Sequence, residues 1–571
     1  MDASPASDHT HGGPFTHGVA SFDPTAASVV LWARVAPGPG APTSVRWCVA
    51  PATDVAPTAS GEVAVPDGTD GCVAVVVEGL LPATTYRYWF EAGGSRSPVG
   101  RTRTLPASGT ETFRIAMVCC ADYSQGYFGV YRAVADATVD LVLHVGDYIY
   151  ESPGRGDARP AEPDKTLATV EDYRTRFAQT RADPDLLALH QRHPVMAVWD
   201  DHDIADNAWR HGAKAHDDAS EGPWEDRLAA SARAWHEWVP SQRPGLARVA
   251  AGGPVAPDDP LAIWRSFPVG DLAEIVLLDT RIDGRDEHAD QEGSPGLDAA
   301  ERAMLGDDQR RWAHERVRDT SRPWSLVVTA VVLNRMQLPI PVGETVNELM
   351  PSGYAIVDDA AICTDEWDGY PAERARLVAA LGDRRRAGAG TVVLSGDVHS
   401  AWAFEGPCDD EGEPVAVEFV APCVTSTPMG AQLPRGWRKL AGELAGELAE
   451  ARWFELEQRG FVILDVDAER ARADWYTVDI GERHARPEPA ASWVTRLDTP
   501  GRLEEVQVVG RPDAPEAPAP APTDAPVHVP GRPADVRPPS RRRRGRAGTI
   551  AVTAVAAGML GVWLWRHPRR R

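Results

Sequence analysis

Four apolar runs of this chain each end in side chains that can bind metal ions. The runs are residues 114–118, 141–145, 195–199 and 391–395. The side chains that follow them are Cys119, Cys120, Asp122, Asp147, Tyr150, Asp200, Asp201, His202, Asp203, Asp397 and His399. Each pattern alone is common in ordinary turns, and their shared position directly after apolar runs is the informative feature.

This set of donors suits two hard cations that share one carboxylate. Two cations about 3.5–4 Å apart can grip the oxygens of a phosphate, generate hydroxide at neutral pH and stabilise the leaving oxygen. The residue types therefore favour hydrolysis of phosphate esters by a metal-activated water at a dinuclear site.

An α/β arrangement would bring these distant residues together. From about residue 111 the apolar runs alternate with helical patterns such as residues 297–318 and 372–387, which is typical of α/β folds. In an open α/β sheet the carboxyl ends of the strands lie on one edge, where ligands bind. We therefore predict an α/β (α+β layered) core over residues 108–507.

Residues 1–107 have a different pattern. Short β-branched and aromatic runs alternate with Pro, Gly, Ser and Asp clusters at the spacing of a β-sandwich. Residues 81–86 resemble the corner of fibronectin-type sandwiches, in which the hydroxyl of Tyr86 would bond back to the backbone. We predict an N-terminal fibronectin-like β-sandwich that carries no chemistry of its own.

The C-terminal region predicts a tether and a membrane anchor. Residues 508–546 are rich in proline and end in arginines, which favours an extended linker. Residues 547–565 contain no charge and would measure about 28 Å as a helix, close to the thickness of a bilayer core. We predict a C-terminal transmembrane helix, with a buried Ala/Gly-rich helix as the alternative. A single-pass anchor with the catalytic body in the cytoplasm is expected, with the other side of the membrane as the alternative.

Charge and cysteine content exclude several classes of protein. The formal net charge is −24, from 59 Lys and Arg against 83 Asp and Glu. Residues 541–571 contain arginines but no Asp or Glu, so the net charge of the rest of the chain is more negative than that of the whole. Such a surface argues against nucleic acid as a partner. Seven scattered cysteines do not make a disulfide framework and favour a reducing compartment.

Eight segments in order resemble the PhoD-like phosphatases, also called the alkaline phosphatase D family. They are residues 15–35, 120–132, 140–151, 198–209, 277–281, 305–312, 366–377 and 394–402. The resemblance covers roughly residues 15–480. It implies a calcineurin-like metallophosphoesterase domain behind a β-sandwich, related to the purple acid phosphatases. It also implies phosphoester hydrolysis with a ferric ion, Fe(3+), and calcium, Ca(2+), or another divalent metal.

The resemblance also implies roles for individual residues. Cys120 would be the thiolate ligand of iron, Asp147 would bridge both metals, and Tyr150 would bind iron as a phenolate. The remaining expected ligands are Asp200, Asp201, Asn207, Asp397 and His399. His202 would orient the phosphate and protonate the leaving oxygen, since the near-neutral pKa of imidazole suits a general acid.

Two further residues are candidates for binding substrate. Arg335 could grip a phosphate with two hydrogen bonds, and Trp367 could line the pocket or simply pack in the core. His144, inside an apolar strand, is expected to be a core histidine or to support a metal ligand.

The expected substrate is a small-molecule or lipid phosphoester. Monoesters and diesters remain open, as does the oligomeric state. Two alternative functions also stay open: a phospholipase D-like phosphodiesterase acting on membrane lipids, and a catalytically inactive, membrane-tethered binding protein. Many relatives are exported, and residues 1–13 show neither the basic start nor the apolar core of an export signal.

Overall fold

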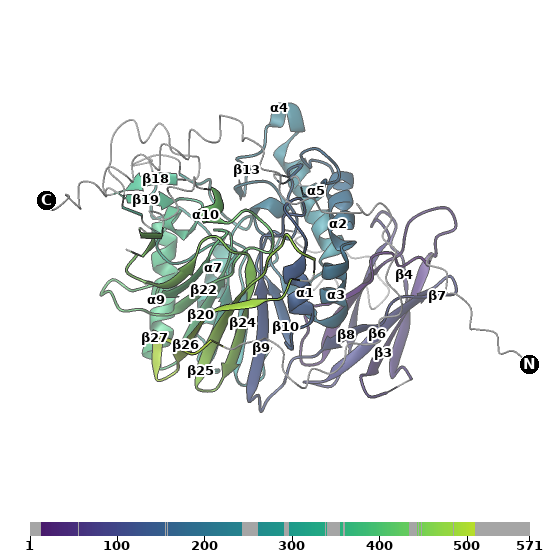
Figure 1. Ribbon diagram of the computed structural model, residues 1–571, viewed down its shortest axis with the longest axis horizontal. Coiled ribbons are helices and arrows are strands. Elements are labelled where there is room, and N and C mark those ends of the chain that lie inside the picture. The colour runs from purple at the N-terminus through teal and green to yellow at the C-terminus, as the bar shows by residue number, and fades with distance from the viewer. Residues whose placement is uncertain are drawn as a thin grey trace, which may run out of the picture.

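Two large mixed β-sheets form the centre of the molecule in the computed structural model (Figure 1). The structure describes residues 13–508, except 55, 155, 157, 243–260, 290–295, 337, 340–353, 358–359, 433–441, 444, 447 and 484. The ten-stranded sheet has the order β27 (Thr499–Glu505), β26 (Glu488–Arg496), β25 (Arg470–Thr477), β24 (Gly460–Asp467), β9 (Thr112–Val118), β10 (Leu141–His144), β11 (Pro194–Ala197), β1 (Val19–Phe22), β2 (Ser28–Arg34), β5 (Cys72–Glu78).

The second sheet has seven strands. Its order is β14 (Arg265–Val269), β15 (Ala273–Leu277), β16 (Trp324–Val328), β20 (Gly390–Ser395), β22 (Val417–Val420), β21 (Ala401–Glu405), β23 (Ala451–Glu455). Its strands alternate between two cores, as the pleat requires. Ile275 and Leu277 of β15 join the core between the two large sheets, whereas Val276 packs under the outer helices.

Helices cover the outer faces of both sheets. Those associated with the ten-stranded sheet are α1 (Gly129–Ala135), α2 (Val170–Arg181), α3 (Pro184–Arg192) and α5 (Trp224–Trp238). Those on the seven-stranded sheet are α7 (Asp307–Arg318) and α9 (Pro371–Arg386). Local sequence explains two of the helix starts: Thr169 and Asp172 form a capping box at α2, and α3 begins with Pro184 after the N-cap Asp183.

The remaining elements are short. They are α4 (Asp218–Glu221), α10 (Met429–Gln432), the 3-10 turns η1 (Asp201–Asp203) and η2 (Trp367–Gly369), the hairpin β12 (Ala208–Trp209) and β13 (Gly212–Ala213), and the sheet of β17 (Leu338–Pro339), β19 (Ala360–Cys363) and β18 (Tyr354–Val357).

The N-terminal strands contain the expected sandwich, but one of its sheets is continuous with the central sheet. The separate sheet contains β4 (Ala59–Ala64), β3 (Ser44–Pro51), β6 (Thr85–Ala92), β7 (Ser95–Arg96) and β8 (Gly100–Arg103). The hydroxyl of Tyr86 accepts a hydrogen bond from the Leu81 N–H at 2.8 Å, as predicted for the corner. Strand β1 pairs in parallel with β11, so β1, β2 and β5 extend the ten-stranded sheet. The boundary at residues 107/108 therefore stays a prediction.

The predicted fold class needs two corrections. Both large sheets are mixed, because parallel central strands are flanked by antiparallel ones such as β24 and β14. The predicted transmembrane helix is the second error. Residues 547–565 lie outside the described residues, and within the described part no helix is long and apolar enough to cross a bilayer. The transmembrane helix, the single-pass anchor and the membrane localisation are therefore not supported.

Parallel strands bring the predicted ligands to one edge. Strands β9, β10 and β11 run parallel in one sheet, and β15, β16 and β20 run parallel in the other. An isolated parallel bridge between Cys119 and Cys423 joins the segment after β9 to the segment after β22. The loops after these strands therefore converge between the two sheets, far apart as they are along the chain.

Candidate metal centre

The backbone at the strand ends adopts an uncommon conformation. The structure has eight described non-glycine residues with positive φ, and five of them belong to the predicted ligand set: Cys120, Asp147, Asn207, Asp397 and His399, with φ between 50° and 62°. Such residues carry strain that concentrates at functional sites. Gly146 has φ +120° and passes so close to Asp200 that an added Cβ would lie 2.5 Å from the Asp200 Cβ.

The first ligand group combines sulfur, oxygen and nitrogen. One ligand atom each from Cys120, Asp147 and His399 lie within 4.8 Å of one another. The Tyr150 hydroxyl donates to Asp147 Oδ2 at 2.7 Å and lies 3.0 Å from His399 Nε2. Ser426 Oγ donates to the same hydroxyl at 2.6 Å. Burial raises the pKa of Cys120 and of Tyr150, so both hold their protons until a cation displaces them.

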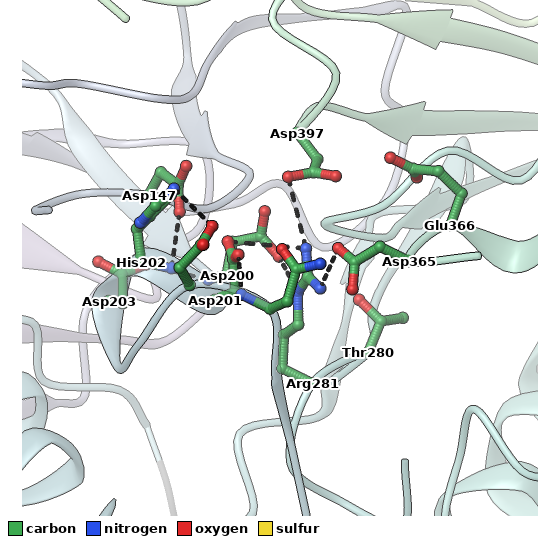
Figure 2. A network of polar contacts seen from close by, with 12 residues as sticks. Asp147, Asp200, Asp201, His202, Asp203, Thr280, Arg281, Asp365, Glu366 and Asp397 are labelled. Carbon is green, nitrogen blue, oxygen red and sulfur yellow. Dashed lines mark hydrogen bonds and ion pairs between the residues drawn. The ribbon is translucent and has the colours of Figure 1, made fainter. Parts of the chain in front are cut away.

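Two more groups extend from the first. Asp147, Asp201 and His202 form one group, and Asp200, Asp201 and Asp397 form the other. Asp147 and Asp201 each belong to two groups, so the three form a continuous chain of donors. Figure 2 shows Asp147 and His202 on one side of this chain and Asp397 on the other, with Asp200 and Asp201 between them.

Two turns of the backbone are fixed together by Asp203. Its Oδ1 accepts from the Ile149 N–H at 3.1 Å, and its Oδ2 accepts from the Asp200 N–H at 2.9 Å. The loop after β10 and the turn η1 are thereby linked. This link also fixes the backbone of His202 beside Asp147, because the His202 N–H donates to Asp147 Oδ1 at 3.2 Å.

His202 is held on three sides. Its Nδ1 lies 2.7 Å from Glu151 Oε2, and its ring stacks on Tyr150 with centroids 4.2 Å apart. Its Nε2 lies 3.7 Å from Asp206 Oδ1. Burial alone would lower the pKa of His202, but the charges of Asp201, Glu151 and Asp147 outweigh burial and raise it well above its usual value.

The carboxylates of the site affect one another's protonation. Burial, together with neighbouring acids, raises the pKa of Asp147 and of Asp200 well above the usual range. Burial also opposes ionisation of Asp201, but Arg281 and His202 outweigh it and lower the pKa of that residue. Burial lowers the pKa of His399 to about 4, so its imidazole is neutral and able to bind a cation.

Several buried polar atoms of the site have no hydrogen-bond partner among the described residues. They include Asp200 Oδ2, Asp201 Oδ1 and Glu366 Oε1. Unsatisfied buried oxygens are costly, and a cation is one way to satisfy them. The donors therefore fit the metals that the resemblance implies: Cys120 and Tyr150 suit a ferric ion, and the carboxylate group suits calcium or another hard divalent ion.

Four residues singled out in the sequence lie outside these groups. Trp367 is fully buried in the core under α7 and α9, where its Nε1 donates to Thr329 Oγ1 at 3.2 Å. Arg335 is exposed. Asn207 is adjacent, because its backbone N–H donates to Asp201 Oδ2 at 2.6 Å. His144 is a buried core histidine, with Nε2 2.8 Å from the Tyr131 hydroxyl.

Sequence reasoning missed two residues that contact the predicted ligands. Glu151 directly follows Tyr150, and Arg281 closes the segment of residues 277–281 that resembles the family, but no role was assigned to either. Glu151 contacts His202, and Arg281 contacts Asp200. Their position in segments of the resemblance was the only available signal.

Comparison with known proteins places most of the described chain in one family. The family model described as PhoD-like phosphatase matches residues 115–475, and the model for the PhoD-like phosphatase N-terminal domain matches residues 2–106. The chain is similar to alkaline phosphatase D of Bacillus subtilis (strain 168), at 32% identity over 519 residues, which cover 86% of this chain and 82% of the relative. A solved structure titled "Structure of PhoD" matches with a TM-score of 0.74 at 29% identity, covering 88% of this chain and 94% of that chain.

Proposed function

Because the chain belongs to the PhoD-like phosphatase family and is a phosphoric ester hydrolase, we propose that it hydrolyses small-molecule phosphate esters at a dinuclear metal centre built on Asp147. The observation that carries this proposal is the sharing of Asp147 between two of the three ligand groups. A shared carboxylate is what two cations at bridging distance require.

The donors favour a different cation in each half of the centre, one half lying around Cys120 and the other around Asp200. We assign a ferric ion to Cys120, Asp147, Tyr150 and His399. We assign calcium or another divalent ion to Asp200, Asp201 and Asp397, with Asp147 as the carboxylate that links the two positions. Bound there, the cations would activate water and polarise the phosphoryl group. The negative charge of the site would otherwise repel a phosphate, so metal loading and substrate binding are coupled.

The chain's own contribution to bond cleavage is the proton of His202. Glu151 fixes Nδ1 at 2.7 Å and Tyr150 fixes the plane of the ring, which leaves Nε2 as the nitrogen that can meet a leaving oxygen. The charges of Asp201, Glu151 and Asp147 raise the pKa of the imidazole, which favours the protonated state that a general acid needs. Glu151 stays ionised, because its contacts with His202 outweigh burial and lower its pKa.

Metal removal tests the proposal directly. Chelator-treated full-length protein should lose its hydrolysis of p-nitrophenyl phosphate and of bis(p-nitrophenyl) phosphate, and recover it on addition of iron and calcium. Elemental analysis of the same preparation should find a transition metal together with a divalent ion. Full activity in a preparation shown to be free of metal would disprove the metal-dependent mechanism. The ratio of rates on the two substrates separates a monoesterase from a diesterase.

A further inference from the structure

A guanidinium group lies inside the all-carboxylate half of the site. Arg281 follows β15 and is fully buried. Its Nε donates to Asp200 Oδ1, and its Nη1 donates to Asp365 Oδ2 at 2.6 Å. Its Nη2 lies 3.4 Å from Asp397 Oδ1 and 3.7 Å from Asp201 Oδ1. Figure 2 shows the guanidinium among these carboxylates.

The loop that carries Arg281 is itself held in place. Asp279 Oδ1 accepts from the N–H groups of Arg281 at 2.9 Å and Ile282 at 3.0 Å, and from Trp199 Nε1 at 3.0 Å. Asp365 is also anchored from behind, because its Oδ1 accepts from Arg285 Nη2 at 2.6 Å. The guanidinium therefore has a fixed position before any cation arrives.

In Asp200 and Asp201, one carboxylate oxygen accepts a hydrogen bond and the other has no hydrogen-bond partner in the described part of the chain. Asp200 Oδ1 accepts from Arg281 Nε, and Asp201 Oδ2 accepts from the Asn207 N–H at 2.6 Å. Asp200 Oδ2, Asp201 Oδ1 and Arg281 Nη2 are buried and have no hydrogen-bond partner among the described residues. The oxygens left over belong to the carboxylates that, with Asp397, form a candidate cation group.

We propose that Arg281 is the positioning residue of this second cation site, and that its charge adapts the site to a divalent ion. The two guanidiniums of Arg281 and Arg285 stand against four carboxylates, which leaves two net negative charges to match one divalent cation. The carboxylates are those of Asp200, Asp201, Asp365 and Asp397. Arg281 also directs the free oxygen of Asp200 towards that cation by holding the other. The inference rests on the proposed function and adds that Arg281 makes the second site prefer a divalent ion.

A competition between Ca²⁺ and Tb³⁺ tests this charge matching. The full-length wild type, Arg281→Met and Arg281→Lys are stripped with chelator, and Tb³⁺ binding is followed by tryptophan-sensitised luminescence with Ca²⁺ as competitor. Arg281→Met should shift the affinity ratio by about tenfold or more in favour of Tb³⁺, because ligand charge sets cation affinity. Arg281→Lys keeps the charge, so its ratio should match the wild type. Its single ammonium cannot hold Asp200 and Asp365 together, so we expect Ca²⁺ affinity to fall by about tenfold.

Arg384→Met is the matched control. Arg384 is also a buried arginine, and its described hydrogen bonds go to the backbone carbonyls of Gly390, Asp319 and Arg322 rather than to carboxylates of the cation group. Its ratio should equal that of the wild type. An unchanged ratio in folded Arg281→Met would overturn the inference, since a purely structural role weakens both ions alike. If Arg281→Met fails to fold by circular dichroism, Arg281→Gln decides, because it keeps a hydrogen-bond donor but removes the charge: an unchanged ratio overturns the inference, and a shift in favour of Tb³⁺ supports it. A wild type that binds neither ion would instead disprove the proposed function.

Discussion

The two halves of the centre differ in donor chemistry and in what surrounds them. The half around Cys120 joins a thiol, a phenol, an imidazole and a carboxylate, and neutral hydroxyls such as that of Ser426 stabilise it. The half around Asp200 has only carboxylates, with a buried arginine among them. The first arrangement suits a highly charged or softer metal that displaces protons, and the second suits a hard ion held by charge. In the proposed centre Asp147 would link the two halves, because it shares one ligand group with Cys120 and another with Asp201.

Replacing the shared carboxylate should have the largest effect. Asp147→Asn removes a charge that touches the thiol group, the phenol and His202, so we expect both cations to bind poorly and kcat/KM to fall on the order of a thousandfold or more. Metal content and hydrolysis of p-nitrophenyl phosphate check this. Asp498→Asn, an exposed carboxylate on the β26–β27 turn, is the control. Retention of both metals in Asp147→Asn would contradict a shared ligand.

Replacing the imidazole of His202 should slow cleavage of the phosphoester bond without removing a metal ion from either half. His202→Asn is expected to lower kcat by about a hundredfold or more on an alkyl phosphate, because a poor leaving group needs a proton. The loss should be much smaller on p-nitrophenyl phosphate, whose leaving group departs without one. The exposed His211→Asn serves as the control. Equal losses on both substrates would argue against a general acid.

Replacing the thiol of Cys120 should affect the metal ion of the first half but not that of the second half. Cys120→Ser removes the sulfur donor from the first half, so we expect loss of any visible charge-transfer absorption and a fall in activity of about tenfold to a hundredfold, with Ca²⁺ content unchanged. Absorption spectra and elemental analysis measure the two outcomes. Cys48→Ser, a buried thiol of the N-terminal sandwich, should leave the spectrum intact. Simultaneous loss of calcium would show that the halves are not independent.

Neutralising the partner of His202 should have the smallest effect. Glu151→Gln keeps an acceptor for Nδ1 but removes one of the charges that raise the pKa of His202, so we expect kcat to fall by about tenfold. Because the protonated imidazole is the active form, activity is lost as pH rises through that pKa, and this alkaline limb should move to lower pH. A kcat–pH profile checks it, with the exposed Glu225→Gln as control. An unmoved limb would mean that Glu151 only supports the structure.

The convergence of the ligands could be predicted, whereas their mutual contacts could not. Apolar runs that end in Asp147 and Asp397 indicate strands, and parallel strands share an edge, so short local patterns sufficed. Arg281 approaches Asp200 across 81 residues of sequence, and Glu151 meets His202 across 51. Charge pairing over such distances depends on which loops face each other, and a single sequence does not record this.

Three other features also depend on information that local sequence patterns lack. The pairing of β1 with β11 depends on which sheet edge is free, and a run of β-branched residues fits either sheet. Trp367 lies in the core because η2 and α9 pack it there, although its neighbours in sequence resemble a site motif. For residues 547–565, composition alone was not sufficient evidence for a membrane anchor, because an uncharged apolar stretch indicates only a capacity to enter a bilayer.

The pairing of β1 with β11 also has a consequence for biosynthesis. Strand β1 is made early in translation, but its partner β11 emerges only after β9, β10 and the helices between them. Until then one edge of β1 stays open, and such long-range pairings are slow to form and prone to aggregation. The N-terminal region is thus completed late by residues of the catalytic body, and removing it would expose the edge of β11, the strand that leads directly into Asp200 and Asp201.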